Sequence, residues 1–164
     1  MFAKGKKSRY LALSVALALG GAWCGGASYQ SVAEAADLTI SGVSPVIPAA
    51  NEAKDEGGAV VGAAAGVNND AANDAPISGK TTEVSGSGTA YAKNVYGGYS
   101  IGSGNVTGNK LDFKEGRVTG DAYAGYSVGS VTDNTATMTG GKIEKTLYGG
   151  YSQTGSVSGN KIHA

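Results

Sequence analysis

The chain has 164 residues and is rich in glycine, with 28 Gly but only one Trp, two Phe and two Met. These numbers exclude a thick conventional core and favour either disorder or thin repeated layers. The 13 basic and 13 acidic residues balance, and from Ala36 onward nine basic residues stand against 12 acidic ones. This balance excludes the basic stripe of a nucleic-acid-binding protein.

Residues 1–35 have the three parts of a secretory signal peptide. A basic stretch at 1–9 is followed by an apolar stretch at 10–23. The apolar stretch is shorter than the roughly 20 residues of a membrane-spanning helix. A small-residue site at Ala33–Ala35 then predicts cleavage after Ala35 or Ala36, with residues 25–27 as a weaker alternative. We therefore expect export to the periplasm, the cell surface or the medium.

Cys24 is the only cysteine. A lipidated cysteine follows a small residue, whereas the bulky Trp23 precedes Cys24, so we expect Cys24 to be discarded with the signal peptide. The mature chain then has no disulfide, and its stability depends on backbone pairing and packing.

Residues 36–80 form a segment of low complexity that contains all three prolines. Leu38 and Ile40 alternate with polar neighbours and predict one short strand. The remainder has two interpretations. Its composition favours a flexible linker, whereas a degenerate repeat would place Val61–Ala64 where the later tyrosine motif stands. Residues 81–94 are a better candidate for a partial repeat.

Residues 81–164 contain a repeat. The pentamer reads YGGYS at 96–100, YAGYS at 123–127 and YGGYS at 148–152, and a second motif reads VTGN, VTDN and VSGN. Tyr96, Tyr123 and Tyr148 are 27 and 25 residues apart. Length differences fall between the two motifs, which is typical of loops on one face of a repeat stack.

A short alternating run follows each VxxN motif. Leu111 and Phe113 in the first run match Ala136 and Met138 in the second, and this period indicates half-buried strands. A unit of about 25 residues with short strands and glycine corners predicts an all-β fold. The expected architecture is a right-handed parallel β-helix (β-solenoid), preceded by the helical signal peptide and the low-complexity segment.

In such a stack, equivalent residues of successive coils lie on one another. One set is identical in all three pentamers: Gly98, Gly125 and Gly150. Glycine at these places indicates positive φ or a close backbone approach. A second set ends the VxxN motifs: Asn109, Asn134 and Asn160. We favour a buried ladder of stacked amides for this set, with three solvated turn residues as the alternative.

Two tyrosine columns are predicted, one of Tyr96, Tyr123 and Tyr148 and one of Tyr99, Tyr126 and Tyr151. We favour structural stacking, since aromatic pairs stabilise repeats without a ligand. The alternative is an exposed strip that binds glycans through Tyr99, Tyr126 and Tyr151.

The residues give little support for catalysis. His163 is the only histidine, and no phosphate loop, H-E-x-x-H motif or calcium-binding nonapeptide is present. The carboxylates are scattered and do not fall in matching columns: Asp112, Glu115, Asp121, Asp133 and Glu144. We expect no enzyme, no metal and no cofactor. A fragment of a β-helical polysaccharide-processing enzyme stays open as an alternative.

The signal peptide together with the VYGGYS, VTGN and TGG units resembles Gly- and Tyr-rich passenger regions of bacterial autotransporters. The resemblance covers about residues 81–164 and the signal peptide. It implies a β-solenoid displayed outside a Gram-negative-type cell, as a stalk or as an adhesin for glycans or proteins of a host or cell surface.

The resemblance also implies membrane attachment through a C-terminal barrel. The sequence has no barrel strands and reaches Ala164 within a unit. We therefore expect a fragment or a truncated product, whose exposed last coil favours self-association.

Overall fold

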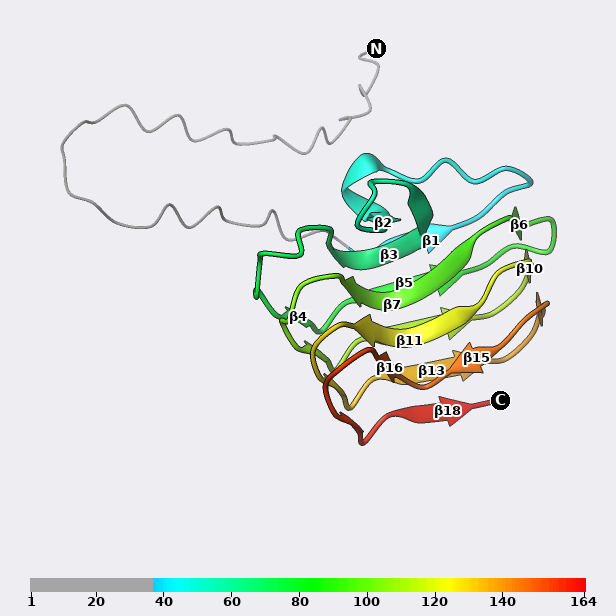
Figure 1. The fold of residues 1–164 in the computed structure, drawn as a ribbon. Helices are drawn as coiled ribbons and strands as arrows, with labels where there is room; N and C mark the ends of the chain where they lie inside the picture. The colour runs from blue at the N-terminus through cyan, green and yellow to red at the C-terminus, as the bar shows by residue number, and fades with distance from the viewer. Residues whose placement is uncertain (1–36) are drawn as a thin grey trace, which may run out of the picture. The chain divides into compact units, whose positions relative to one another are not determined.

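The computed structural model describes residues 37–164, which form a β-solenoid (Figure 1). The predicted signal peptide, its cleavage site and Cys24 lie outside the described residues. Within the described part the chain is all-β, apart from one short 3-10 helix, and neighbouring coils pair almost entirely in parallel. The predicted fold class is confirmed.

Each complete coil passes through four sheets in the order B, C, A and D. Sheet B holds β2 (Glu52–Lys54), β3 (Val60–Asn68), β7 (Asn94–Ser100), β11 (Ala122–Ser127), β15 (Leu147–Tyr148) and β16 (Tyr151–Ser152). Sheet C holds β4 (Ile77–Ser78), β8 (Val106–Thr107), β12 (Val131–Thr132) and β17 (Val157–Ser158).

Sheet A is the longest uninterrupted parallel sheet, with β1 (Leu38–Ile40), β5 (Thr81–Val84), β9 (Lys110–Phe113), β13 (Thr135–Met138) and β18 (Lys161–His163). Sheet D holds β6 (Ala90–Tyr91), β10 (Arg117–Val118) and β14 (Lys142–Ile143). β7, β8, β9 and β10 are therefore one coil, and β11 to β14 are the next.

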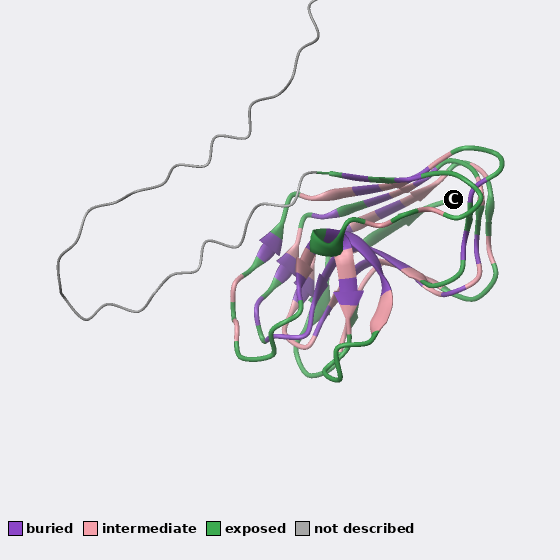
Figure 2. Cartoon of the chain, turned by 90° about the horizontal axis from the view of Figure 1, so that it is seen from above, coloured by how far each residue is buried: buried purple, intermediate pink, exposed green. Residues whose placement is uncertain are grey.

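The core consists mainly of aliphatic residues, together with Phe113 and Tyr91. Figure 2 shows the buried segments of successive coils in purple. In sheet A, Leu111 pairs with Ala136 and Phe113 with Met138, as the alternating runs predict. Leu111 and Phe113 are fully buried, whereas the intervening Asp112 is only half-buried. Burial of each large aliphatic side chain contributes about 1.5–3 kcal/mol.

A strand occupies the middle of the segment for which the sequence leaves a linker and a degenerate repeat as alternatives. β3 pairs with β7 along most of its length, and Ala64 stands beside Tyr96. The predicted alignment, with Val61 in that place, is wrong by three residues. In the observed register Gly66 pairs with Gly98 of the pentamer, whereas Gly62 pairs with Asn94.

An N-terminal cap covers one end of sheet B. The 3-10 helix η1 (Ala49–Asn51) leads into β2, which pairs with β3 in the antiparallel direction. The Asn51 side chain donates to the carbonyl oxygens of Ala64 and Ala65 at 3.0 and 3.2 Å. Because β2 runs against the direction of the coils, the parallel pattern of sheet B ends there.

Candidate functional site

Asn109, Asn134 and Asn160 form one column inside the stack. The Asn109 side-chain amide donates to Oδ1 of Asn134 at 3.0 Å, and the Asn134 amide donates to Oδ1 of Asn160 at 2.9 Å. The backbone N–H groups of Asn109 and Asn134 donate to the same two oxygens at 2.9 Å. Asn109 and Asn134 have no exposed surface. The structure thus brings the three residues together as the ladder interpretation expects.

Close approach to the asparagine column explains the repeated glycine. A Cβ atom on Gly98 would lie 2.8 Å from Nδ2 of Asn109, and one on Gly125 would lie 2.7 Å from Nδ2 of Asn134. Gly150 stands in the same relation to Asn160, at 2.6 Å. Of the two reasons that the sequence offers for these glycines, close approach applies, because none of the three has positive φ.

The column reaches one coil further than the sequence motif suggests. Ile77 and Ser78 pair with Val106 and Thr107, and the backbone N–H of Lys80 donates to Oδ1 of Asn109 at 3.0 Å. The tetrapeptide ISGK at 77–80 is therefore a VxGN motif that has lysine in place of asparagine. The sequence contains three of the four residue types of this motif, but lysine replaces the asparagine by which the motif is recognised.

A bend in each sheet B strand places both tyrosines of the pentamer on the outer face. Val95 packs in the interior, while Tyr96 and Tyr99 belong to a separate cluster. Gly97 is skipped in the pairing of β7 with β11, where the register passes from Tyr96 directly to Gly98. Ala124, at the equivalent place, points into the core. The two middle residues of the pentamer thus both face inward. The tyrosines before and after them, which are three residues apart, therefore lie on the same outer face.

The tyrosines stack in two parallel columns. The ring centroid of Tyr123 lies 5.1 Å from that of Tyr96 and 4.7 Å from that of Tyr148, with interplanar angles of 11° and 5°. In the second column, Tyr126 lies 5.2 Å from Tyr99 and 5.3 Å from Tyr151. Rings of the two columns meet edge to face. Each contact of this geometry contributes about 0.5–1.5 kcal/mol beyond burial.

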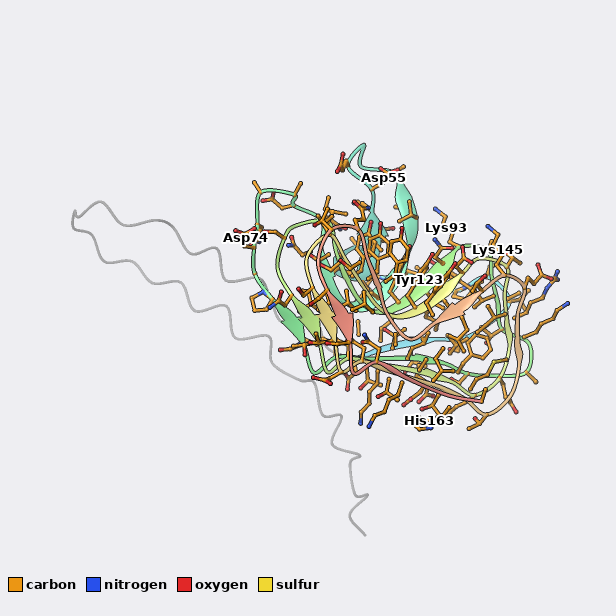
Figure 3. All side chains as sticks on the ribbon, turned by 60° about the horizontal axis from the view of Figure 1, so that its bottom comes forward. Asp55, Asp74, Lys93, Tyr123, Lys145 and His163 are labelled. Atoms are coloured by element: carbon orange, nitrogen blue, oxygen red, sulfur yellow. The ribbon has the colours of Figure 1, made fainter. Side chains whose placement is uncertain are left out.

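Exposure of the rings rises along the stack, so the three tyrosines proposed for glycan binding are not equivalent. Tyr99 is 3% exposed, and its hydroxyl donates to the carbonyl oxygen of Lys54 in the cap at 2.9 Å. Tyr126 is half-buried and accepts a hydrogen bond from Gln153 at 2.7 Å. Tyr151 is 42% exposed. The strip is accessible only toward its C-terminal end. Figure 3 shows Tyr123 among these rings, on the side that carries the cap with Asp55.

Burial changes the ionisation of the tyrosines. Desolvation raises the pKa of Tyr96, Tyr99 and Tyr123 well above the ordinary value of about 10. Tyr91 in sheet D has its pKa raised to about 12, chiefly by desolvation and further by the charge of Glu52. These phenols stay neutral at physiological pH, which suits packing and not acid–base chemistry.

The serine that ends each pentamer has a role that the repeat analysis did not assign. Ser127 is fully buried; its hydroxyl donates to the carbonyl oxygen of Gly104 at 2.8 Å and accepts from the N–H of Gly129 at 2.9 Å. The Ser152 hydroxyl likewise donates to the carbonyl oxygen of Gly129 at 2.6 Å. Ser127 and Ser152 thus each connect their loop to the preceding coil, whereas the Ser100 hydroxyl donates to the carbonyl oxygen of Gly102 in its own loop. The identity of this serine in all three pentamers was the available signal.

The acidic residues do not converge. Glu83 pairs with Lys114 at 2.6 Å, and Glu144 pairs with Arg117, all on outer faces. The Asp121 side chain accepts from the backbone N–H of Thr146 at 3.1 Å, a structural contact between coils. No group of three or more metal-ligating side chains occurs among residues 37–164.

A groove of about 340 Å³ lies beside the cap. Its lining includes Pro45, Ile47, Tyr91 and two opposite charges, Glu52 and Lys93. The Lys93 ammonium group donates to the carbonyl oxygen of Val60 at 2.6 Å. Lys93 thus has a structural partner at the rim.

Comparison with protein-family models, curated proteins and solved structures found no match to this chain. None of the helices within residues 37–164 has the length and apolar character needed to cross a membrane.

Proposed function

We propose that the chain is an exported β-solenoid segment of an autotransporter-like surface protein, which serves as a structural stalk or as an adhesin. One observation carries the proposal: the repeated asparagines and tyrosines make their hydrogen bonds and ring contacts with the same residues of neighbouring coils. Asn134 joins the coils above and below it, and Tyr123 stacks on rings of both. Motifs used in this way build length, and their repetition extends a rod without new chemistry.

Two further features support a scaffold. Every buried side-chain nitrogen and oxygen of the described residues has a hydrogen-bond partner. The acidic groups form outer ion pairs and turn contacts, and they do not line a shared groove. A catalytic centre requires convergent groups with matched pKa values, and the scaffold role needs none.

Export is tested by expression of the full chain in a Gram-negative host. We expect a product outside the cytoplasm whose N-terminus is Ala36 or Asp37, as determined by mass spectrometry. A Leu17→Arg variant, which places a charge in the apolar stretch, should stay unprocessed in the cytoplasm. Cytoplasmic retention of the unaltered chain at full length would contradict the proposed export.

The stalk and adhesin roles are distinguished by coating beads with the purified chain and measuring adhesion to host-cell and glycan surfaces. Adhesion that is lost when surface residues are changed without loss of fold supports an adhesin. A glycan-binding role has one observation in its favour, the partly exposed rings of Tyr126 and Tyr151. Tyr151→Ala should then abolish glycan binding while the circular dichroism spectrum is kept.

A further inference from the structure

Tyr91 brings a hydroxyl group to a column of sheet D that is otherwise aliphatic. It pairs with Val118 of the next coil, which in turn pairs with Ile143. Val118 is fully buried, and Ile143 packs against the same core. Because aliphatic side chains meet the packing needs of this position in two coils, packing does not explain the Tyr91 hydroxyl.

The Tyr91 hydroxyl has no hydrogen-bond partner among residues 37–164, although the residue is only 7% exposed. The hydroxyls of the buried Tyr96 and Tyr99 are both hydrogen-bonded. Every fully covered side-chain nitrogen or oxygen of the described residues has a partner, so the Tyr91 hydroxyl must reach an opening. Tyr91 lines the groove beside the cap, and the groove provides that opening.

The groove lies where the coil that begins with β1 leaves sheet D. The backbone N–H of Ala90 donates to the carbonyl oxygen of Gly42 at 3.2 Å. Pro45 follows three residues later and has no N–H group with which to continue this ladder. The groove separates residues 44–47 from residues 90–93. Both walls are internal segments of the chain.

The lining combines aliphatic walls with charged and phenolic groups. Its apolar residues are Pro45, Ile47, Val60, Ala90 and Ala92. Its ionisable groups are the Tyr91 hydroxyl, the Glu52 carboxylate and the Lys93 ammonium group. The charge of Glu52 helps to raise the pKa of Tyr91, which shows that the carboxylate and the phenol are within electrostatic reach of each other.

The ionisable groups keep free hydrogen-bonding capacity. Lys93 uses one of its three ammonium N–H donors on the carbonyl oxygen of Val60. Oε2 of Glu52 lies 3.5 Å from the Lys54 ammonium group, in a partly exposed ion pair of small energy. A ligand can therefore accept hydrogen bonds from Lys93 and Tyr91 and donate one to Glu52.

We propose that the groove binds a short apolar peptide with free termini. The ligand ammonium group donates to Glu52, its peptide carbonyl accepts from Tyr91, and its carboxylate accepts from Lys93, while its side chains cover the aliphatic walls. The volume of about 340 Å³ is at the lower end of the roughly 300–1,000 Å³ of small-ligand sites, which suits a ligand of about two residues. A sugar fits less well, because the Tyr91 ring packs in the core and offers no free face for stacking.

The probe is dileucine, titrated into the purified full chain and followed by isothermal titration calorimetry and heteronuclear NMR. We expect saturable binding that shifts the backbone amides of Ile47, Ala92 and Lys93. N-acetyl-dileucine amide lacks both charges and should bind at least about tenfold more weakly, because hydrogen bonds to charged groups are the stronger ones. Peptide binding here is independent of export and of the tyrosine columns, so a negative result would leave the stalk or adhesin proposal standing.

Tyr91→Phe is the decisive variant because it removes only the hydroxyl. It should weaken dileucine binding about fivefold, the worth of one hydrogen bond. Its urea midpoint should stay equal or rise, since the hydroxyl has no partner in the fold. Tyr148→Phe is the matched control, which removes a tyrosine hydroxyl outside the groove and should leave binding unchanged.

Glu52→Gln tests the charge of the groove. It should weaken binding of dileucine about tenfold and leave binding of N-acetyl-dileucine amide unchanged, because only dileucine carries an ammonium group. Circular dichroism confirms that each variant is folded.

Four results would overturn the proposal. They are no saturable binding of dileucine, equal binding by the Tyr91→Phe and Tyr148→Phe variants, equal binding of dileucine and its blocked form, and a lowered urea midpoint for Tyr91→Phe, which would give the hydroxyl a structural role. Saturable binding of maltose with shifts of the same amides would assign the groove to sugars and would refute the peptide site as well.

Discussion

The centre of the asparagine column offers the sharpest test of the fold. Asn134 makes five side-chain hydrogen bonds without any exposure to solvent. Its amide donates to the carbonyl oxygens of Val106 and Thr132, each at 3.0 Å, and to Oδ1 of Asn160. Its own Oδ1 accepts from the backbone and side chain of Asn109. Asn134→Ala removes all five bonds at once.

The expected loss of stability follows from the number of hydrogen bonds that the substitution removes. A hydrogen bond contributes about 1 kcal/mol net, and a buried group left without a partner costs more. Some loss is offset because the Asn109 amide keeps its bonds to Ile77 and Thr107. We expect Asn134→Ala to lower the free energy of unfolding by about 4 kcal/mol, a large share of the 5–15 kcal/mol of a typical domain.

Asn160→Ala is the matched control. Asn160 occupies the same place in the motif, but it lies in the last described coil, and part of its hydrogen bonding is accessible to water. Water can replace the partners of the Asn160 amide, although the backbone N–H of Asn134 loses its acceptor, so the expected loss is smaller, about 2 kcal/mol. Both values are measured by urea unfolding followed by circular dichroism and tyrosine fluorescence, with coincident transitions as the test of two-state behaviour.

Asn134→Asp separates hydrogen bonding from volume. The carboxylate has nearly the same shape, but it faces three oxygen acceptors and cannot donate to them. Burial should raise its pKa, so the variant should be least stable at neutral pH, regain stability as the pH falls through that raised pKa, and reach its full recovery at about pH 4, the ordinary pKa of aspartate. Losses below about 1 kcal/mol for Asn134→Ala, or equal losses for Asn134→Ala and Asn160→Ala, would refute the ladder as a source of stability.

Three further predictions concern other columns. Gly97→Ala should cost about 1–3 kcal/mol, because a Cβ atom there would lie 2.3 Å from the Ala124 carbonyl oxygen, whereas Gly149→Ala should be tolerated at a nearest contact of 3.5 Å; equal urea midpoints would contradict this. Tyr123→Ala should cost about 3 kcal/mol because it removes a ring stacked on both sides, and Tyr151→Ala clearly less, as thermal unfolding can measure. Because the pKa values of Tyr91, Tyr96 and Tyr99 are raised in the folded state, their contribution to stability should be constant below about pH 10 and fall as the pH rises through the folded values; a loss of tyrosinate absorbance from the folded chain at about pH 10 when Tyr96 is replaced by Phe would contradict the burial of that ring.

Particular residues show how far the sequence leads. The spacing of Tyr96, Tyr123 and Tyr148 predicts the stacking that the register confirms. The spacing works because parallel coils place equivalent residues about 4.8 Å apart, so a repeat in sequence becomes a column in space. By contrast, the cap could not be predicted. Residues 49–54 show neither alternation nor a helical stripe, and β2 is held by pairing with β3, a contact that exists only after β3 has joined the stack.

The sequence by itself determined the repeat unit, the all-β solenoid and the identity of the asparagine and tyrosine columns, because these depend on period alone. Only the tertiary structure decided which register β3 takes, why Gly98 must lack a side chain, and that Tyr99 is covered while Tyr151 is exposed. These features depend on contacts between coils and on which neighbours cover each coil, and both exist only in the folded stack. The exposure that decides what the surface can bind therefore comes from position in the stack, which identical motifs cannot encode.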